Sequence, residues 1–175
     1  MAKRHAEESQ FLFSSTRFEW RDRIDGERFE GFVKEIIDLS PGVRWSAFAG
    51  LANEPDGGRD ILVEWEMPLL PGELDAKDPD RTHRVCRIVV QCKADLRPVG
   101  VSRVTAILDT VEFHEAEGYL LVVRSRVTRP LADRLDRHRS KGRRFNWWTG
   151  DDLEERLRRY RHVVARYPDV LTAID

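Results

Sequence analysis

The sequence predicts an α/β fold in which a mixed central β-sheet is flanked by helices on both faces. The first observation is the order of the apolar patterns, which reads helix, three strands, helix, strand, helix, strand, helix. The second is that the first three strands can pair as an antiparallel meander, whereas the later strands arrive through helical crossovers. A chain of 175 residues is long enough to bury such a core as one domain.

The composition indicates a folded protein with a highly charged surface. Hydrophobic residues make up 41% of the chain and charged residues 35%, and a disordered chain would be poorer in apolar residues. The formal net charge is only −1. The molecule as a whole is therefore no polycation, and any affinity for nucleic acid has to come from local basic patches.

The cysteines and the apolar runs predict a cytoplasmic protein. Cys86 and Cys92 fall in one apolar run, and we interpret them as buried thiols in a reducing compartment. They lack the second Cys or His pair of a zinc site. No apolar run reaches transmembrane length, and residues 1–8 lack the apolar core of a signal peptide. We therefore expect no membrane association.

In the first half of the chain, one helix is predicted to precede three strands. Apolar residues at steps of three and four within residues 26–39 are typical of an amphipathic helix. The predicted strands are 43–49, 61–67 and 85–93. The segment 68–82, rich in Pro, Gly and acidic residues, is expected to be a long surface hairpin connection. The aromatic segment from Gln10 to Trp20 is expected to pack against the body of the domain.

The second half alternates helices with strands. The continuous apolar run 118–123 predicts a central strand covered on both faces, and 144–148 predicts a shorter one. The predicted helices are 99–116 (or 101–116), 128–140 and 151–166. Thr149 and Asp152 resemble a capping box at the start of the last helix.

Two polar clusters at strand ends suggest a catalytic site. Asp60 follows the double glycine Gly57-Gly58 and directly precedes an apolar strand, while Gln91 and Lys93 close the next strand and share a face by alternation. A carboxylate of this kind, completed by the backbone carbonyl of Cys92, can hold a divalent metal beside a phosphodiester. A lysine nearby can orient or activate water and stabilise charge in the transition state.

Each of these residues also has a plain structural interpretation. Asp60 can be a turn cap, Gln91 a polar strand end and Lys93 a solvated edge lysine. Asp56 is an alternative ligand, although it more naturally shapes the glycine turn, whereas Asp60 abuts the strand. Glu30 borders the apolar stripe of the first helix, where an ordinary glutamate is half-exposed. The conjunction of both clusters with the following helix and central strand favours the catalytic interpretation.

The two clusters resemble the PD-(D/E)xK nuclease superfamily. The segment Gly57-Gly58-Arg59-Asp60 followed by Val90-Gln91-Cys92-Lys93 is similar to the Mrr-like restriction endonuclease branch, whose variant motif has Gln in the middle position. The resemblance covers roughly residues 27–148 and implies a restriction-endonuclease-like core. From its length we expect the chain to form one nuclease-like domain over residues 1–175, with the N-terminal aromatic segment and the C-terminal helix packed on the core.

The resemblance implies a Mg²⁺-dependent endodeoxyribonuclease, with Mn²⁺ as a possible substitute. Asp60 would be the main metal ligand, Gln91 the second motif residue, Lys93 the catalytic lysine and Glu30 a carboxylate that supplements the metal site with the Cys92 carbonyl. The substrate would be DNA, cut in prokaryotic defence. The protein would act as a homodimer, or as the nuclease module of a larger protein or complex with a sensor or NTPase component.

Basic residues between 124 and 144 offer a route for a phosphate backbone. The candidates for nucleic-acid binding are Arg124, Arg126, Arg143, Arg144 and, near a helix start, Ser102. The alternatives are an arginine-rich helix face paired with nearby acids and, for Ser102, a helix cap.

Other functions have less support in the sequence. The five histidines are scattered, with no i, i+4 pair and no evident partner, so a histidine-based metallohydrolase or a Ser-His-Asp hydrolase is not favoured. They are His5, His83, His114, His138 and His162. The two alternatives to the DNA endonuclease are an inactive module of the same fold that binds nucleic acid or a partner, and a ribonuclease.

Overall fold

A five-stranded mixed sheet forms the centre of the molecule. The computed structural model describes residues 16–49, 60–74 and 78–174. The strands lie in the order β2 (Val43–Ala49), β3 (Asp60–Pro68), β4 (His83–Lys93), β5 (Gly118–Val123) and β6 (Arg144–Trp148). Strands β2, β3 and β4 pair antiparallel, while β4, β5 and β6 pair parallel, so the predicted mixed sheet is confirmed.

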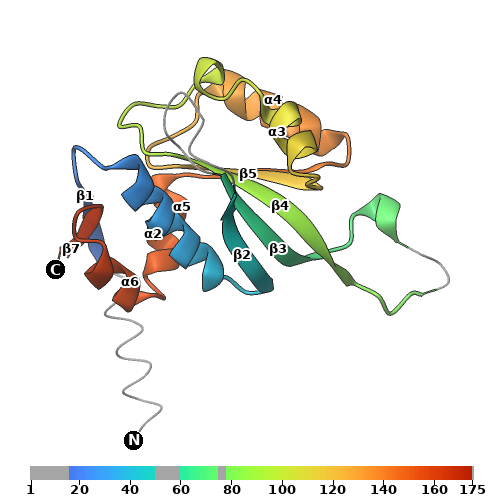
Figure 1. Ribbon diagram of the computed structural model, residues 1–175, viewed down its shortest axis with the longest axis horizontal. Coiled ribbons are helices and arrows are strands. Elements are labelled where there is room, and N and C mark those ends of the chain that lie inside the picture. The colour runs from blue at the N-terminus through green and yellow to red at the C-terminus, as the bar shows by residue number, and fades with distance from the viewer. Residues whose placement is uncertain (1–15, 50–59, 75–77, 175) are drawn as a thin grey trace, which may run out of the picture.

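Helices cover both faces of this sheet, as Figure 1 shows. On one face lie α2 (Gly26–Asp38), α5 (Gly150–Leu157) and α6 (Arg161–Arg166), and on the other lie α3 (Ile107–Phe113) and α4 (Arg129–Ser140). Every residue of β5 is buried, with Leu120 and Val122 in one core and Tyr119, Leu121 and Val123 in the other. Among the described residues, no helix is long and apolar enough to span a membrane.

The helix α2 forms where the apolar spacing predicts it. Asp25 caps it, because its carboxylate accepts a hydrogen bond from the backbone N–H of Arg28 at 3.0 Å. Its apolar stripe is fully buried against the sheet; the residues are Phe29, Phe32, Val33, Ile36 and Ile37. Burial of five such side chains fixes the helix firmly over the sheet and, with it, the position of Glu30.

Two predicted helices differ in the structure. Instead of one helix from residue 99, the chain forms the 3-10 turn η2 (Val101–Arg103) and the short α3. Val99 forms a β-bridge with Val127, and this pairing uses the backbone groups that a helix would need. The predicted helix 151–166 is divided into α5 and α6, because Tyr160 leaves helical geometry and its hydroxyl donates to the Leu39 carbonyl at 2.7 Å. The predicted capping box at Thr149 and Asp152 is confirmed.

A second, two-stranded sheet joins the segments near the two ends of the chain. Strand β1 (Arg17–Trp20) pairs antiparallel with β7 (Leu171–Ile174), and neither strand was expected from the sequence. Trp20 packs edge-on against Phe32 and donates its indole N–H to Glu154 at 2.7 Å. The apolar residues Phe11, Leu12 and Phe13 of the same segment lie outside the described residues.

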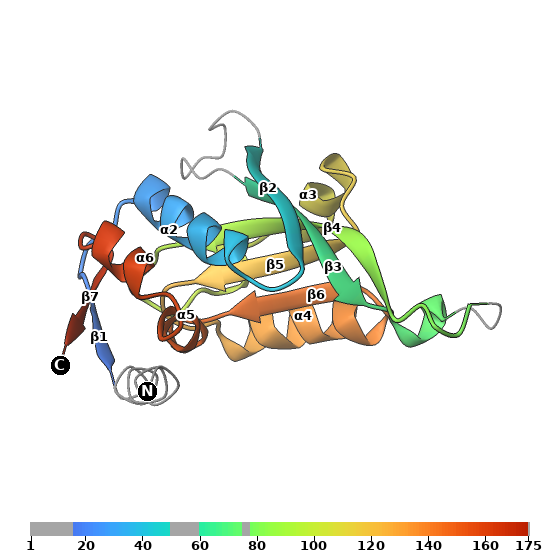
Figure 2. The same ribbon diagram turned by 90° about the horizontal axis from the view of Figure 1, so that it is seen from below.

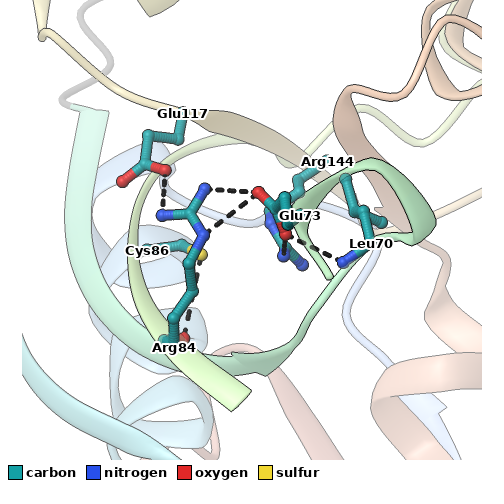
Figure 3. A network of polar contacts seen from close by, with 6 residues as sticks. All are labelled: Leu70, Glu73, Arg84, Cys86, Glu117 and Arg144. Carbon is teal, nitrogen blue, oxygen red and sulfur yellow. Dashed lines mark hydrogen bonds and ion pairs between the residues drawn. The ribbon is translucent and has the colours of Figure 1, made fainter. Parts of the chain in front are cut away.

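The β3–β4 hairpin extends beyond the sheet and is anchored by one carboxylate (Figures 2 and 3). Glu73, at the end of η1 (Pro71–Glu73), accepts hydrogen bonds from Arg84, from Arg144 and from the backbone N–H of Leu70. Arg84 also pairs with Glu117. The Arg84 guanidinium, together with the other donors, lowers the pKa of Glu73 to about 2. The hairpin is thereby tied to the starts of β5 and β6.

Candidate active site

Asp60 and Gln91 lie opposite each other on the neighbouring antiparallel strands β3 and β4. Strands β3 and β4 pair so that Ile61 lies opposite Val90, which puts Asp60, one residue earlier, opposite Gln91, one residue later. Opposite residues of an antiparallel pair point to the same face of the sheet. A carboxylate and an amide therefore lie side by side where β3 begins and β4 ends, as the sequence predicts.

Lys93 and Glu30 line one cavity at this end of the sheet. Lys93 is the last residue of β4 and Glu30 lies near the start of α2, and only 6% and 3% of their surfaces are exposed. The cavity has a volume of about 230 Å³ and is also lined by Cys92 and Arg103. Lys93 is therefore no solvated edge lysine and Glu30 no half-exposed helix carboxylate. Charged groups buried together in a cavity are typical of functional sites.

The environment of Cys92 links Asp60 to this cavity. The pKa of the Cys92 thiol is raised well above its usual value, first by burial and then by the negative charges of Glu30 and Asp60. The positive charge of Lys93 acts in the opposite direction. Glu30, Asp60 and Lys93 are therefore close enough to Cys92 for their charges to act on its thiol.

The donor set suits a small hard cation. Among the described residues, no three His, Cys, Asp or Glu side chains lie close enough to hold a metal by themselves. The carboxylates of Asp60 and Glu30 and the main-chain oxygen of Cys92 are hard oxygen donors, and Mg²⁺ takes only one or two protein carboxylates while keeping waters. These residues fit Mg²⁺ better than Zn²⁺, which prefers a closed nitrogen and sulfur shell.

Two further residues hold the motif side chains in place. Nε2 of His114 and Oδ2 of Asp60 are hydrogen-bonded at 2.9 Å, and the hydroxyl of Tyr119 donates to Oε1 of Gln91 at 2.8 Å. The sequence analysis found no partner for His114, and the structure corrects this. Sequence spacing carries no signal for the pair, because 54 residues separate His114 from Asp60.

Arg103 is another residue of the site that the motifs do not reveal. It lines the cavity with Lys93 and pairs with Asp95, which lines the same cavity, at 3.1 Å. Its neighbour Ser102 is exposed. The sequence feature that could have indicated Arg103 is its position next to Ser102, shortly after the strand that ends at Lys93. Asp56 and the segment Gly57–Arg59 lie outside the described residues.

The arginines proposed for nucleic-acid binding fall into two groups. Arg124 directly follows β5, and its backbone N–H donates to the Lys93 carbonyl at 3.0 Å, so Arg124 and the exposed Arg126 lie at the site end of the sheet. The side chain of Arg124 is buried, however, and donates to the Asp22 carbonyl. Arg143 and Arg144 lie at the opposite end, since Arg144 pairs with Gly118 and Gly118 with Ile88, five residues before Lys93.

Arg144 is committed to the hairpin anchor. Its side chain is 6% exposed and pairs with Glu73. In this arrangement neither Arg144 nor Arg124 is open to a phosphate backbone. Arg126 and Arg143 remain exposed, and of these only Arg126 lies towards the end of the sheet where β4 ends. Of the four arginines expected to bind nucleic acid, Arg126 is thus the one that is both exposed and at the site end of the sheet.

Comparison with protein families identifies the class to which this fold and site belong. The family model Mrr_cat, described as restriction endonuclease, matches residues 21–157. This match spans more than half of the chain, so the chain belongs to this restriction endonuclease family. The matched region includes Glu30, Asp60, Gln91 and Lys93. The resemblance based on the two motifs is thus confirmed. No curated protein sequence matches the chain.

Two solved structures match this chain over less than a third of their own length. AspBHI, described as a DNA modification-dependent restriction endonuclease, matches with a TM-score of 0.50 and 18% identity over 77% of this chain and 31% of that chain. MspJI, solved in complex with a 27-mer oligonucleotide, matches with a TM-score of 0.46 and 12% identity over 89% of this chain and 31% of that chain. The AspBHI comparison supports a restriction-endonuclease-like fold. The chain spans less than a third of the length of either protein.

Proposed function

We propose that the protein is a metal-dependent endodeoxyribonuclease that hydrolyses phosphodiester bonds in DNA. The observation that carries this proposal is the grouping of Asp60, Gln91, Lys93 and Glu30 at one end of the sheet, with Lys93 and Glu30 buried in one cavity. Membership of the restriction endonuclease family supports the same conclusion. An exposed lysine or an isolated carboxylate would not support this proposal.

Mg²⁺ is the proposed cofactor, with Mn²⁺ as a substitute. Asp60 would be the main ligand, with Glu30 and the Cys92 carbonyl completing the protein share of the shell. When bound, the cation would neutralise charge on the scissile phosphate and lower the pKa of a water molecule. The burial of Glu30 favours this role, since a carboxylate withdrawn from water gains most from a nearby cation.

The side chains of this site would act on the phosphate and on the attacking water. Lys93 carries donors only, so its ammonium would hold a water in position and stabilise negative charge that develops on a phosphate oxygen. Gln91 is uncharged and would orient water or phosphate by hydrogen bonds. Both effects are stronger in a cavity that excludes bulk water than on an open surface.

The biological setting of the proposed nuclease is prokaryotic defence in the cytoplasm. Residues 1–175 would form one nuclease-like domain that acts as a homodimer, or as a module beside a sensor or NTPase component. The length of AspBHI supports a modular arrangement, because the fold shared with this chain occupies only 31% of that protein. Recognition of a sequence or modification would then reside in another part of the assembly.

Cleavage of supercoiled plasmid, with and without DNA methylation, tests the proposal in Mg²⁺ and Mn²⁺. Asp60→Asn and Lys93→Met keep the shapes of the side chains and remove their charges. We expect each to lower the cleavage rate by about 10²–10⁴-fold, the range of a lost acid–base or charge-stabilising group. Matched controls are Asp133→Asn and Lys141→Met, which remove the same charges from exposed positions on or next to α4.

Each outcome of the plasmid assay has a distinct meaning. Equal cleavage by the wild type and both site variants would refute the assigned site. No cleavage by the wild type on any plasmid with either metal would favour the inactive binding module. A parallel assay on single-stranded RNA separates the third possibility, since cleavage of RNA alone would identify a ribonuclease.

A further inference from the structure

We propose that His114 is a positioning residue for Asp60, acting as the outer hydrogen-bond partner of the metal-binding carboxylate. This inference rests on the proposed metal site. The observation behind it is the 2.9 Å contact between His114 Nε2 and Asp60 Oδ2. Only 9% of the His114 side chain and 12% of the Asp60 side chain are exposed, so the contact is shielded from water. A shielded hydrogen bond to a charged group is stronger than an exposed one.

The chemistry of the pair fixes the role of each atom. An ionised carboxylate can only accept hydrogen bonds, so Nε2 of His114 carries the hydrogen and donates it to Oδ2. With Oδ2 oriented by the imidazole, the carboxylate cannot rotate freely, and Oδ1 takes a defined direction. A carboxylate held in this way does not have to be ordered when it receives a cation, which lowers the entropic cost of binding.

The backbone at the end of α3 holds His114 rigidly. His114 is the C-cap of this helix, and Glu115 after it adopts a left-handed conformation with φ of 49°. The N–H of Glu115 donates to the Glu112 carbonyl and that of Ala116 to the Val111 carbonyl, which together form a Schellman motif. This motif usually has glycine where Glu115 stands.

The left-handed backbone conformation of Glu115 indicates that the turn after α3 has a function. Glu115 is the sole non-glycine residue with positive φ in the part of the chain that the structure describes. A side chain in this conformation strains the backbone, because Cβ comes close to the neighbouring carbonyl oxygen. Such strain persists where surrounding contacts require it, and the contact adjacent to it is the one between His114 and Asp60. The turn thus delivers the imidazole to the carboxylate.

Mn²⁺ binding in the absence of DNA tests the inference without a cleavage readout. The titration, by calorimetry or electron paramagnetic resonance, compares the wild type with His114→Ala, His114→Gln and Asp60→Asn. Gln can place an N–H donor near the position of Nε2, whereas Ala cannot. The matched control is His162→Ala, which removes an exposed imidazole on α6. Thermal unfolding of each variant verifies that it is folded.

We expect His114→Ala to weaken Mn²⁺ binding by about 10–100-fold, the usual effect of losing an outer-shell partner. His114→Gln should restore most of the affinity, and His162→Ala should leave it unchanged. Wild-type affinity in His114→Ala would overturn the inference, and tighter binding would also overturn it, since His114 would then be blocking the carboxylate. If Asp60→Asn binds Mn²⁺ as the wild type does, the proposed metal site itself is refuted. This result is distinct from a failure of the His114 inference alone, in which Asp60→Asn loses Mn²⁺ binding and His114→Ala retains it.

Discussion

Gln91 occupies the position at which the wider nuclease superfamily places an acid, and its amide is held by a buried hydroxyl. Tyr119 is fully buried, and its hydroxyl donates to Oε1 of Gln91 at 2.8 Å. An uncharged amide contributes through directed hydrogen bonds rather than through charge, so its orientation matters more than that of a carboxylate. Tyr119 therefore supports Gln91 as His114 supports Asp60.

Tyr119→Phe tests this support, because it removes the hydroxyl and keeps the ring that packs on Phe145. We expect a loss of about 1–3 kcal/mol in the free energy of unfolding, since a partly buried hydrogen bond is lost, and a lower rate of DNA cleavage. Urea denaturation and the plasmid assay measure the two effects. The matched control is Tyr160→Phe, which removes a hydroxyl bonded to the Leu39 carbonyl away from the cavity.

The two tyrosine variants separate stability from activity. Tyr160→Phe should lose a similar free energy of unfolding and retain cleavage. If Tyr119→Phe also cleaves at the wild-type rate, the hydroxyl of Tyr119 does not position Gln91 for the reaction.

The residues of the site differ in how far the sequence reveals them. Alternation along one strand is sufficient to place Gln91 and Lys93 on one face, and Asp60 at the start of the neighbouring strand follows from antiparallel pairing. Glu30 emerged only through the family resemblance, because its place depends on how α2 packs on the sheet. His114 and Tyr119 have no local pattern, since their contacts join distant segments whose approach is decided by the whole fold.

Among the elements, the β3–β4 hairpin is held in place by the carboxylate of Glu73. Glu73 binds Arg84 and Arg144, and Arg84 also binds Glu117 (Figure 3). Because the hydrogen bond from Arg84 and its neighbours lowers the pKa of Glu73 from 4.5 to about 2, the ionised form stabilises the fold. This contribution is complete above the pKa of the unfolded state and is lost as the pH falls towards the folded-state pKa of about 2.

Glu73→Gln should therefore lower the free energy of unfolding by about 1 kcal/mol or more at pH 7, a discounted value for a partly exposed network. The same variant should lose less stability than the wild type as the pH falls from 5 to 2.5. Urea denaturation across this range measures both effects. Glu66→Gln is the matched control, because its exposed pair with Arg44 should contribute little. Parallel pH profiles for Glu73→Gln and the wild type would contradict the anchor.

The elements predicted well are those with strong periodicity and clear ends. The helix α2 and the strands β2, β5 and β6 match their predicted ranges closely. The region around Val99 was mistaken for a helix because valines spaced along it suit either structure, and a bridge to Val127 decided the outcome. The pairing of β1 with β7 joins two segments that are far apart in the sequence, and no local pattern predicts such a contact.

At the scale of the molecule, the proposed chemistry and the hairpin anchor lie at opposite ends of the sheet. The cavity lies where β4 ends and α2 begins, whereas Glu73 and Arg144 lie where β6 starts. The helices on the two faces bury separate apolar cores and hold the strands that position the site (Figure 1). Substitutions in the hairpin should therefore change mainly the free energy of unfolding. Substitutions at the strand ends of the site should change mainly the rate of DNA cleavage.

Anomalous diffraction from crystals soaked in Mn²⁺ tests the central claim most directly. We expect one strong peak that contacts the Asp60 carboxylate and the main-chain oxygen of Cys92, with Glu30 bound to the ion directly or through water. Crystals of Asp60→Asn treated in the same way should lack this peak. A peak elsewhere, an unchanged peak in Asp60→Asn, or no peak at saturating Mn²⁺ would contradict the proposed metal-dependent nuclease site.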